Sequence, residues 1–122
     1  MMKRISFQTR SLAFLLSAWI CLSFAPPHHG WSNYDQNKTL NFTGEILEST
    51  YENPHGMLKF RVENDTWTVV LAPPARMEAR GLSKAMLAKG ATANVVGYPH
   101  KKEKGEMRAE RITIGDKTTE LR

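Results

Sequence analysis

Polar and apolar residues alternate along five stretches of the chain, and this alternation limits the possible folds more than any other feature. Successive side chains of a strand point to opposite faces, so a period of two predicts half-buried β-strands. From Thr39 onwards the sequence therefore predicts a mainly β fold. The expected inward positions, in chain order, are Leu40, Phe42, Gly44 and Ile46; Leu58, Phe60 and Val62; Trp67, Val69 and Leu71; Ala91, Ala93, Val95 and Gly97; and Ala109, Ile112 and Ile114.

Breaks in this pattern predict turns and irregularities. Asn64 and Asp65 separate the second and third stretches closely enough to predict a hairpin. Gly44 in mid-strand predicts a bend or bulge, and a slip of phase near Glu110–Arg111 predicts another. A short last strand is expected over residues 118–121.

A helical segment is expected between the third and fourth strands. Pro73 and Pro74 stop the third strand, and residues 75–90 are rich in helix formers. Gly81 and Ser83 divide this segment, which predicts two short helical turns, with Ser83 capping the second and Gly90 closing it.

The order of these elements favours one architecture. Three strands, a helix, two more strands and a short extra one, with bulges at corners, predict a small five-stranded Greek-key β-barrel of the OB type over residues 39–122. A β-sandwich would need about seven strands and no helix in mid-chain. The composition, with 41% hydrophobic and 24% charged residues, suits a globular domain.

The N-terminus has the three-part pattern of a secretory signal. Lys3, Arg4 and Arg10 precede an apolar run over residues 11–25 that ends in small residues. We expect residues 1–25 to be a cleaved signal peptide and the protein to be periplasmic or secreted, although Pro26 obscures the cut. The alternative, a retained anchor, is disfavoured because spanning a bilayer takes about 20 apolar residues. Residues 26–38 are expected to form an extended arm.

The formal charge of +5 first suggests a nucleic-acid partner. The expected signal, however, holds three of the 17 basic residues and none of the 12 acidic ones, so the remainder is nearly balanced at +2. Export and this balance argue against nucleic acid, and we expect no stable membrane span after cleavage. Cys21, the single cysteine, leaves with the signal, which excludes a disulfide and thiol chemistry. We find no catalytic signature and expect no enzymatic activity.

The four histidines lie in predicted loops or in the arm. On an OB barrel, the loops after strands 1 and 4 flank the ligand face, which would bring His55 and His100 to one rim. His28 and His29 in the arm could reach the same place. Imidazoles without thiols suit copper or zinc, so all four are candidate metal ligands. The alternative is that they are solvated or structural.

Aromatic residues near the same loops give a second hypothesis. The protein could be a non-enzymatic module that holds a periplasmic protein or a small ligand on the face of strands 2 and 3. Alternatively, Trp31 and Tyr34 pin the arm onto the barrel. The candidate contact residues are Trp31, Tyr34, Tyr51, Asn53 and Tyr98.

A set of short motifs, taken in order, resembles a known family. They are His28-His29-Gly30-Trp31 with Tyr34-Asp35, then residues 39–46, Asn53-Pro54-His55, Val96-Gly97-Tyr98-Pro99 and residues 108–116. The chain resembles the small exported bacterial proteins grouped as domain of unknown function 6152. The resemblance implies a secreted bacterial protein and supplies no mechanism. Pro26 and Pro27 precede the His pair here, which argues against a histidine brace at the mature N-terminus.

Overall fold

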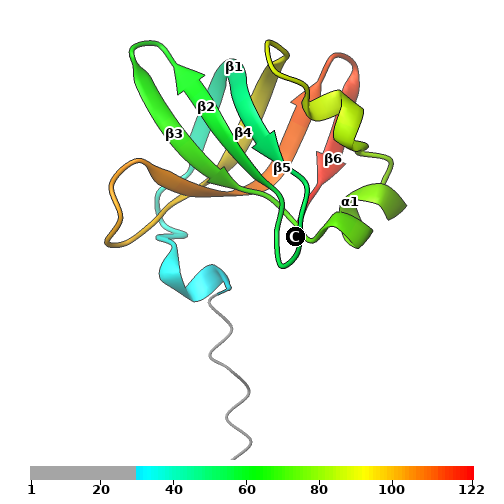
Figure 1. Ribbon diagram of the computed structural model, residues 1–122. Coiled ribbons are helices and arrows are strands. Elements are labelled where there is room, and N and C mark those ends of the chain that lie inside the picture. Colours follow the sequence, from blue (N-terminus) through cyan, green and yellow to red (C-terminus); the bar gives the residue numbers. More distant parts are fainter. Residues whose placement is uncertain (1–29) are drawn as a thin grey trace, which may run out of the picture.

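The computed structural model describes residues 30–122 and shows a closed β-barrel (Figure 1). Neighbours in the sheet follow the order β3-β2-β1-β4-β5-β6. β3 also pairs in parallel with β5, which closes a five-stranded mixed barrel and leaves β6 outside on β5. The expected OB-type barrel with a short helix between β3 and β4 is thus confirmed. The strands are β1 (Leu40–Thr50), β2 (Met57–Val62), β3 (Asp65–Val70), β4 (Thr92–Pro99), β5 (Glu106–Ile114) and β6 (Lys117–Glu120).

The alternating residues fill the barrel as the period of two predicts. Phe60 and Ile46 are the largest side chains that are fully buried, and Gly97 lies on the inner face. Leu40, Phe42 and Trp67 are partly buried against this core. The fully buried centre also includes Leu58, Val69, Leu71, Ala93, Val95, Met107, Ala109 and Ile112.

Two of the predicted irregularities can be compared with the strand registers. Val96 pairs with Arg111 but Gly97 pairs with Ala109, so Glu110 is the extra residue of a bulge, as predicted. Of the bend or bulge predicted at Gly44, the bulge is wrong, because pairing with β4 is regular there. The β1–β2 register shifts three residues later, around Leu47. Gly44 is required instead for close packing, since a side chain would overlap the backbone carbonyl of Arg61.

The segment between β3 and β4 contains two short turns of helix. α1 (Pro74–Ala79) begins at a proline, whose fixed φ suits the first helical position. The second turn is a 3-10 helix, η2 (Lys84–Leu87). Ser83 precedes η2 but its side chain makes no capping hydrogen bond, and η2 ends before Gly90. The predicted roles of Ser83 and Gly90 are therefore wrong.

The helix α1 fastens the C-terminal end of the chain. Arg80 donates to the carbonyl oxygen of Glu120 at 2.7 Å and Arg76 to that of Leu121 at 3.1 Å. Met77 buries itself in the core from the same helix. None of the helices within residues 30–122 is long and apolar enough to cross a membrane.

Gly97 offers a direct test of the bulge. A Cβ there would overlap the carbonyl oxygen of Arg108 and lie 2.9 Å from Cα of Ala109. We expect Gly97→Ala to lower the free energy of unfolding by about 1–3 kcal/mol, measured by urea denaturation. Thr92→Ala, at an exposed position of the same strand, is the control. Equal stability of the two variants would contradict this packing.

Candidate ligand-binding face

The strand registers align outward-facing residues into rows that cross the barrel. Met57 pairs with Val70, Val70 with Arg108, and Arg108 with Tyr98, so these four side chains lie side by side on the outer surface. The next row contains Glu48, Lys59, Thr68 and Glu106. Together the rows form what we call the outer face, which crosses β1, β2, β3, β5 and β4. In OB folds, the surface of strands 2 and 3 carries the ligand.

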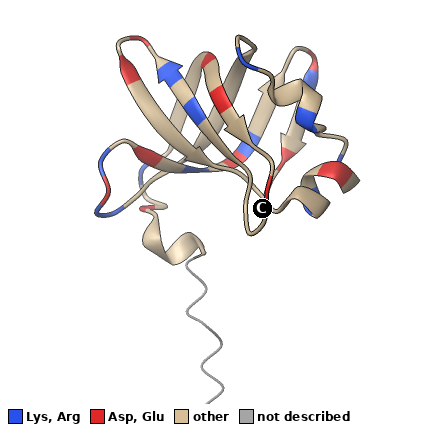
Figure 2. Cartoon of the chain, in the orientation of Figure 1, with Lys and Arg blue, Asp and Glu red and all other residues tan. Residues whose placement is uncertain are grey.

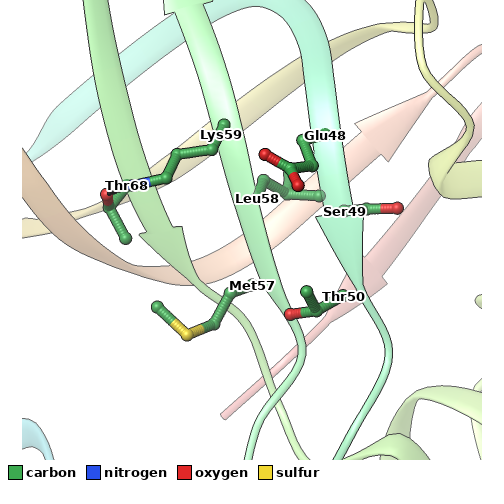
Figure 3. Close-up of a pocket in the computed structure, with 7 residues that line it drawn as sticks. All are labelled: Glu48, Ser49, Thr50, Met57, Leu58, Lys59 and Thr68. Atoms are coloured by element: carbon green, nitrogen blue, oxygen red, sulfur yellow. Dashed lines mark hydrogen bonds between the residues drawn. The ribbon is translucent and has the colours of Figure 1, made fainter.

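A shallow hollow of about 170 Å³ lies on this face. Figure 3 shows Met57 and Lys59 extending from β2 toward β3, with Glu48 and Thr50 on the β1 side. Lys59 donates to the hydroxyl of Thr68 at 2.9 Å. Among the described residues, Met57 alone is an exposed large hydrophobic side chain, at 37%. The lining combines the apolar residues Met57 and Leu58 with five polar residues, and ligand sites use such polar groups to fix the orientation of what they bind.

The segment before β1 forms one wall of the face. Tyr34 pairs with His100 through an isolated β-bridge, and the backbone N–H of Asp35 donates to the carbonyl of Pro99 at 2.8 Å. The hydroxyl of Tyr34 donates to Glu106 at 2.9 Å. This side chain, a candidate contact residue in the sequence, is only 6% exposed. Burial and Glu106 raise the pKa of Tyr34 well above its ordinary value, so it remains a neutral donor.

Trp31 fixes the start of this wall. It lies in η1 (Trp31–Asn33), a single 3-10 turn at the same end of the barrel as the β1–β2 loop (Figure 1). The guanidinium groups of Arg108 and Arg122 lie over its ring, 4.6 and 4.5 Å from the centroid. Tyr98 contacts it edge to face. Residues 30–38 are thus docked rather than extended, which favours the alternative that Trp31 and Tyr34 pin the arm.

His55 stands over the Arg108 end of the outer face. It belongs to the loop between β1 and β2, and its Nε2 lies 3.4 Å from an Nη2 of Arg108. Burial, then the charges of Arg108 and Arg76, lower the pKa of His55. The imidazole is therefore neutral at pH 7.

His100 is occupied by the local backbone. Its Nδ1 accepts hydrogen bonds from the N–H groups of Lys102 (3.0 Å) and Glu103 (2.9 Å). Its Nε2 lies 3.8 Å from a carboxylate oxygen of Glu106, and its ring contacts Tyr34 edge to face. This ring therefore shapes the turn into the β4–β5 loop, which Figure 2 shows as a charged loop beside the docked segment.

The predicted site residues divide into three groups. His55, His100, Trp31, Tyr34 and Tyr98 gather around Arg108 and Glu106, whereas Tyr51 and Asn53 do not join them. Tyr51 donates to the carbonyl of Leu82 at 2.6 Å and packs against the core, and Asn53 is exposed in the β1–β2 loop. His28 and His29 lie outside the described residues. Within residues 30–122, His, Cys, Asp and Glu side chains form no group of three or more that could hold a metal ion.

The sequence did not single out the residues on which this surface depends most. Arg108 occupies an outward strand position, which ordinarily means solvent, yet it is only 6% exposed because Trp31 and His55 cover it. Met57 is the first residue of β2, and alternation predicts that it points outward. Alternation does not predict that it borders a hollow. The sequence marks Arg108 only as an outward arginine between inward Met107 and Ala109, which does not indicate that it is buried.

Comparison with known proteins identifies the family. A model described as a family of unknown function, DUF6152, matches residues 18–109, more than half of the chain. The chain belongs to the DUF6152 family. The match covers β1 to β4, the first part of β5 and the docked segment, so this DUF6152 domain is a small β-barrel of the OB type. No curated protein matches the sequence.

Solved structures add little to this assignment. Fifty-two chains match. One belongs to a crystal structure of TiaS in complex with a tRNA and ATP, with 18% identity over 73% of this chain and a TM-score of 0.49. The DUF6152 domain spans about a fifth of that chain, and a similarity at this level carries no argument.

The His55 environment predicts a pH dependence. Because its pKa in the folded state is lower than the unfolded value of about 6.5, the unfolded chain binds more protons below that pH. We expect the free energy of unfolding to fall as pH drops below about 6.5, and more steeply in the wild type than in His55→Gln. Urea denaturation between about pH 4.5 and about pH 8 measures both curves. Parallel curves would contradict the assignment.

Proposed function

We propose that the DUF6152 domain is a non-enzymatic binding module and that its outer face holds a small ligand or an extended segment of a partner protein. The observation that carries this proposal is the hollow of about 170 Å³ bordered by exposed Met57. Ligand sites are concave surfaces that combine apolar area with a few polar groups at fixed positions, and the lining of this hollow has both.

The walls of the hollow support a fixed site. Lys59 donates to the hydroxyl of Thr68, and both residues line the hollow, so these polar groups are held in place before any ligand arrives. Strands also hold Met57 and Val70 in register. Preorganised groups lose little entropy on binding, which favours recognition by this face over the loops.

Methyl and amide NMR can locate binding. We expect fragments from a panel with apolar, anionic and cationic members to shift the signals of Met57, Lys59 and Thr68 more than those of the rest of the domain. Met57→Gln should weaken such binding about threefold to tenfold, because it removes the exposed apolar side chain that borders the hollow. Thr118→Gln, on the exposed face of β6, is the control. Hits that cluster elsewhere, or equal binding by both variants, would contradict the proposal.

A second candidate function is binding of copper or zinc, with His28 and His29 as the principal ligands. The observation in its favour is that His29 is close enough along the chain to reach the surroundings of His55. Trp31 and His55 both contact Arg108, and His29 is only two residues before Trp31, hence within about 7 Å of it along the chain. A neutral His55 retains a lone pair for a metal. The positive charge of Arg108 disfavours a cation there, and Nδ1 of His100 is already engaged, so these two histidines contribute less.

Calorimetric titration with Cu(II) tests this second candidate on the chain from Pro26 onwards. We expect His28→Ala/His29→Ala to weaken Cu(II) binding at least tenfold, because two imidazole ligands are lost. His55→Ala/His100→Ala should weaken it less. Unchanged affinity in both double variants would eliminate metal binding through these histidines.

A further inference from the structure

We propose that the ligand of the outer face is an anionic amphiphile, with its apolar chain on Met57 and Val70 and its carboxylate at the Arg108–His55 end. This inference rests on the proposed function, since it names the chemical class that the same face would bind. It follows from how apolar and cationic side chains are distributed along a single row.

The row is apolar at one end and cationic at the other. Met57 and Val70 form its apolar half, and Arg108 follows directly on the neighbouring strand. Adjacent strands lie about 4.8 Å apart, so Met57 and Arg108 are separated by roughly 10 Å along the sheet. The extended chain of octanoate is comparable in length to this separation. A ligand with one charged end would therefore match the row without leaving the surface.

Positive charge is concentrated at the Arg108 end of the row. The guanidinium groups of Arg108 and Arg122 each lie over the Trp31 ring, so two cations lie around this indole at the Arg108 end of the row. Arg76 and Arg122 are close enough to Arg108 to lower its pKa further, after the effect of its burial. The carboxylates nearby, Glu106 and Glu110, accept hydrogen bonds from Tyr34 and Tyr98. Arg122 lies 3.9 Å from Glu110 and Arg76 donates to the carbonyl of Leu121, so Arg108 would be the principal partner of a ligand carboxylate, with the other two arginines adding to the positive field at reduced dielectric.

A ligand would reach Arg108 by displacing the His55 ring. His55 is partly exposed, and its contact with Nη2 of Arg108, at 3.4 Å, is at the long limit for a hydrogen bond. A carboxylate makes shorter, charge-assisted bonds to a guanidinium group, so it would displace the imidazole. The negative charge would then favour protonation of His55 and add a second donor to the ligand.

The test compares octanoate with octanamide, which has the same chain and no charge. We expect the wild-type protein to bind octanoate at least tenfold more tightly, as followed by the NMR shifts of Met57 and of the His55 ring. Octanoate should also raise the pH at which the His55 ring titrates, whereas octanamide should not. Octylamine, with the opposite charge, should bind more weakly than octanamide.

Variants separate the two ends of the row. Arg108→Gln should abolish the preference for octanoate, and Arg122→Gln, at an exposed position, should reduce it if the first variant does not fold. Met57→Gln should weaken octanoate and octanamide equally. Equal binding of octanoate and octanamide at Met57 would overturn the anionic class but leave the proposed function standing. Failure of every probe to shift the outer face would overturn both.

Discussion

The barrel closes through the parallel pairing of β3 with β5. This pairing involves only three residue pairs, Thr68 to Val70 with Glu106 to Arg108. The same three pairs bring the apolar side chain of Val70 beside the buried cation of Arg108. A barrel closed one residue out of register would turn one of these side chains inward, because successive residues face opposite sides. The same strand register therefore closes the core and forms the outer face.

The docked segment before β1 explains how the barrel tolerates a nearly buried arginine. Trp31 covers the guanidinium group of Arg108, and Tyr34 bridges to Glu106 from the same segment. Burying a charge is costly, so it persists only where surrounding groups stabilise it. The π face of an indole and the neutral imidazole of His55 stabilise a cation without neutralising it. The segment therefore preserves positive charge at one end of the outer face.

The sequence predicted the fold far better than the site, for a physical reason. Alternation reports which face of a strand is buried, so it identified the inward residues and located the bulge at Glu110. It carries no information about register between distant strands, and the meeting of Met57, Val70 and Arg108 depends on that register. Topology alone predicted that the loops of His55 and His100 flank one face, and the structure places His55 beside Arg108 and His100 beside Glu106 of the same strand. The sequence did not predict that backbone donors occupy His100, because these hydrogen bonds depend on the exact conformation of the loop after it.

The central claim is that one row of the outer face binds a ligand in a single orientation. Intermolecular nuclear Overhauser effects in the complex with octanoate measure this most directly. We expect contacts from the terminal methyl of octanoate to the methyl groups of Met57 and Val70, and from its carboxylate end to the His55 ring. Contacts confined to another surface, or a reversed chain with its carboxylate at Met57, would contradict this claim.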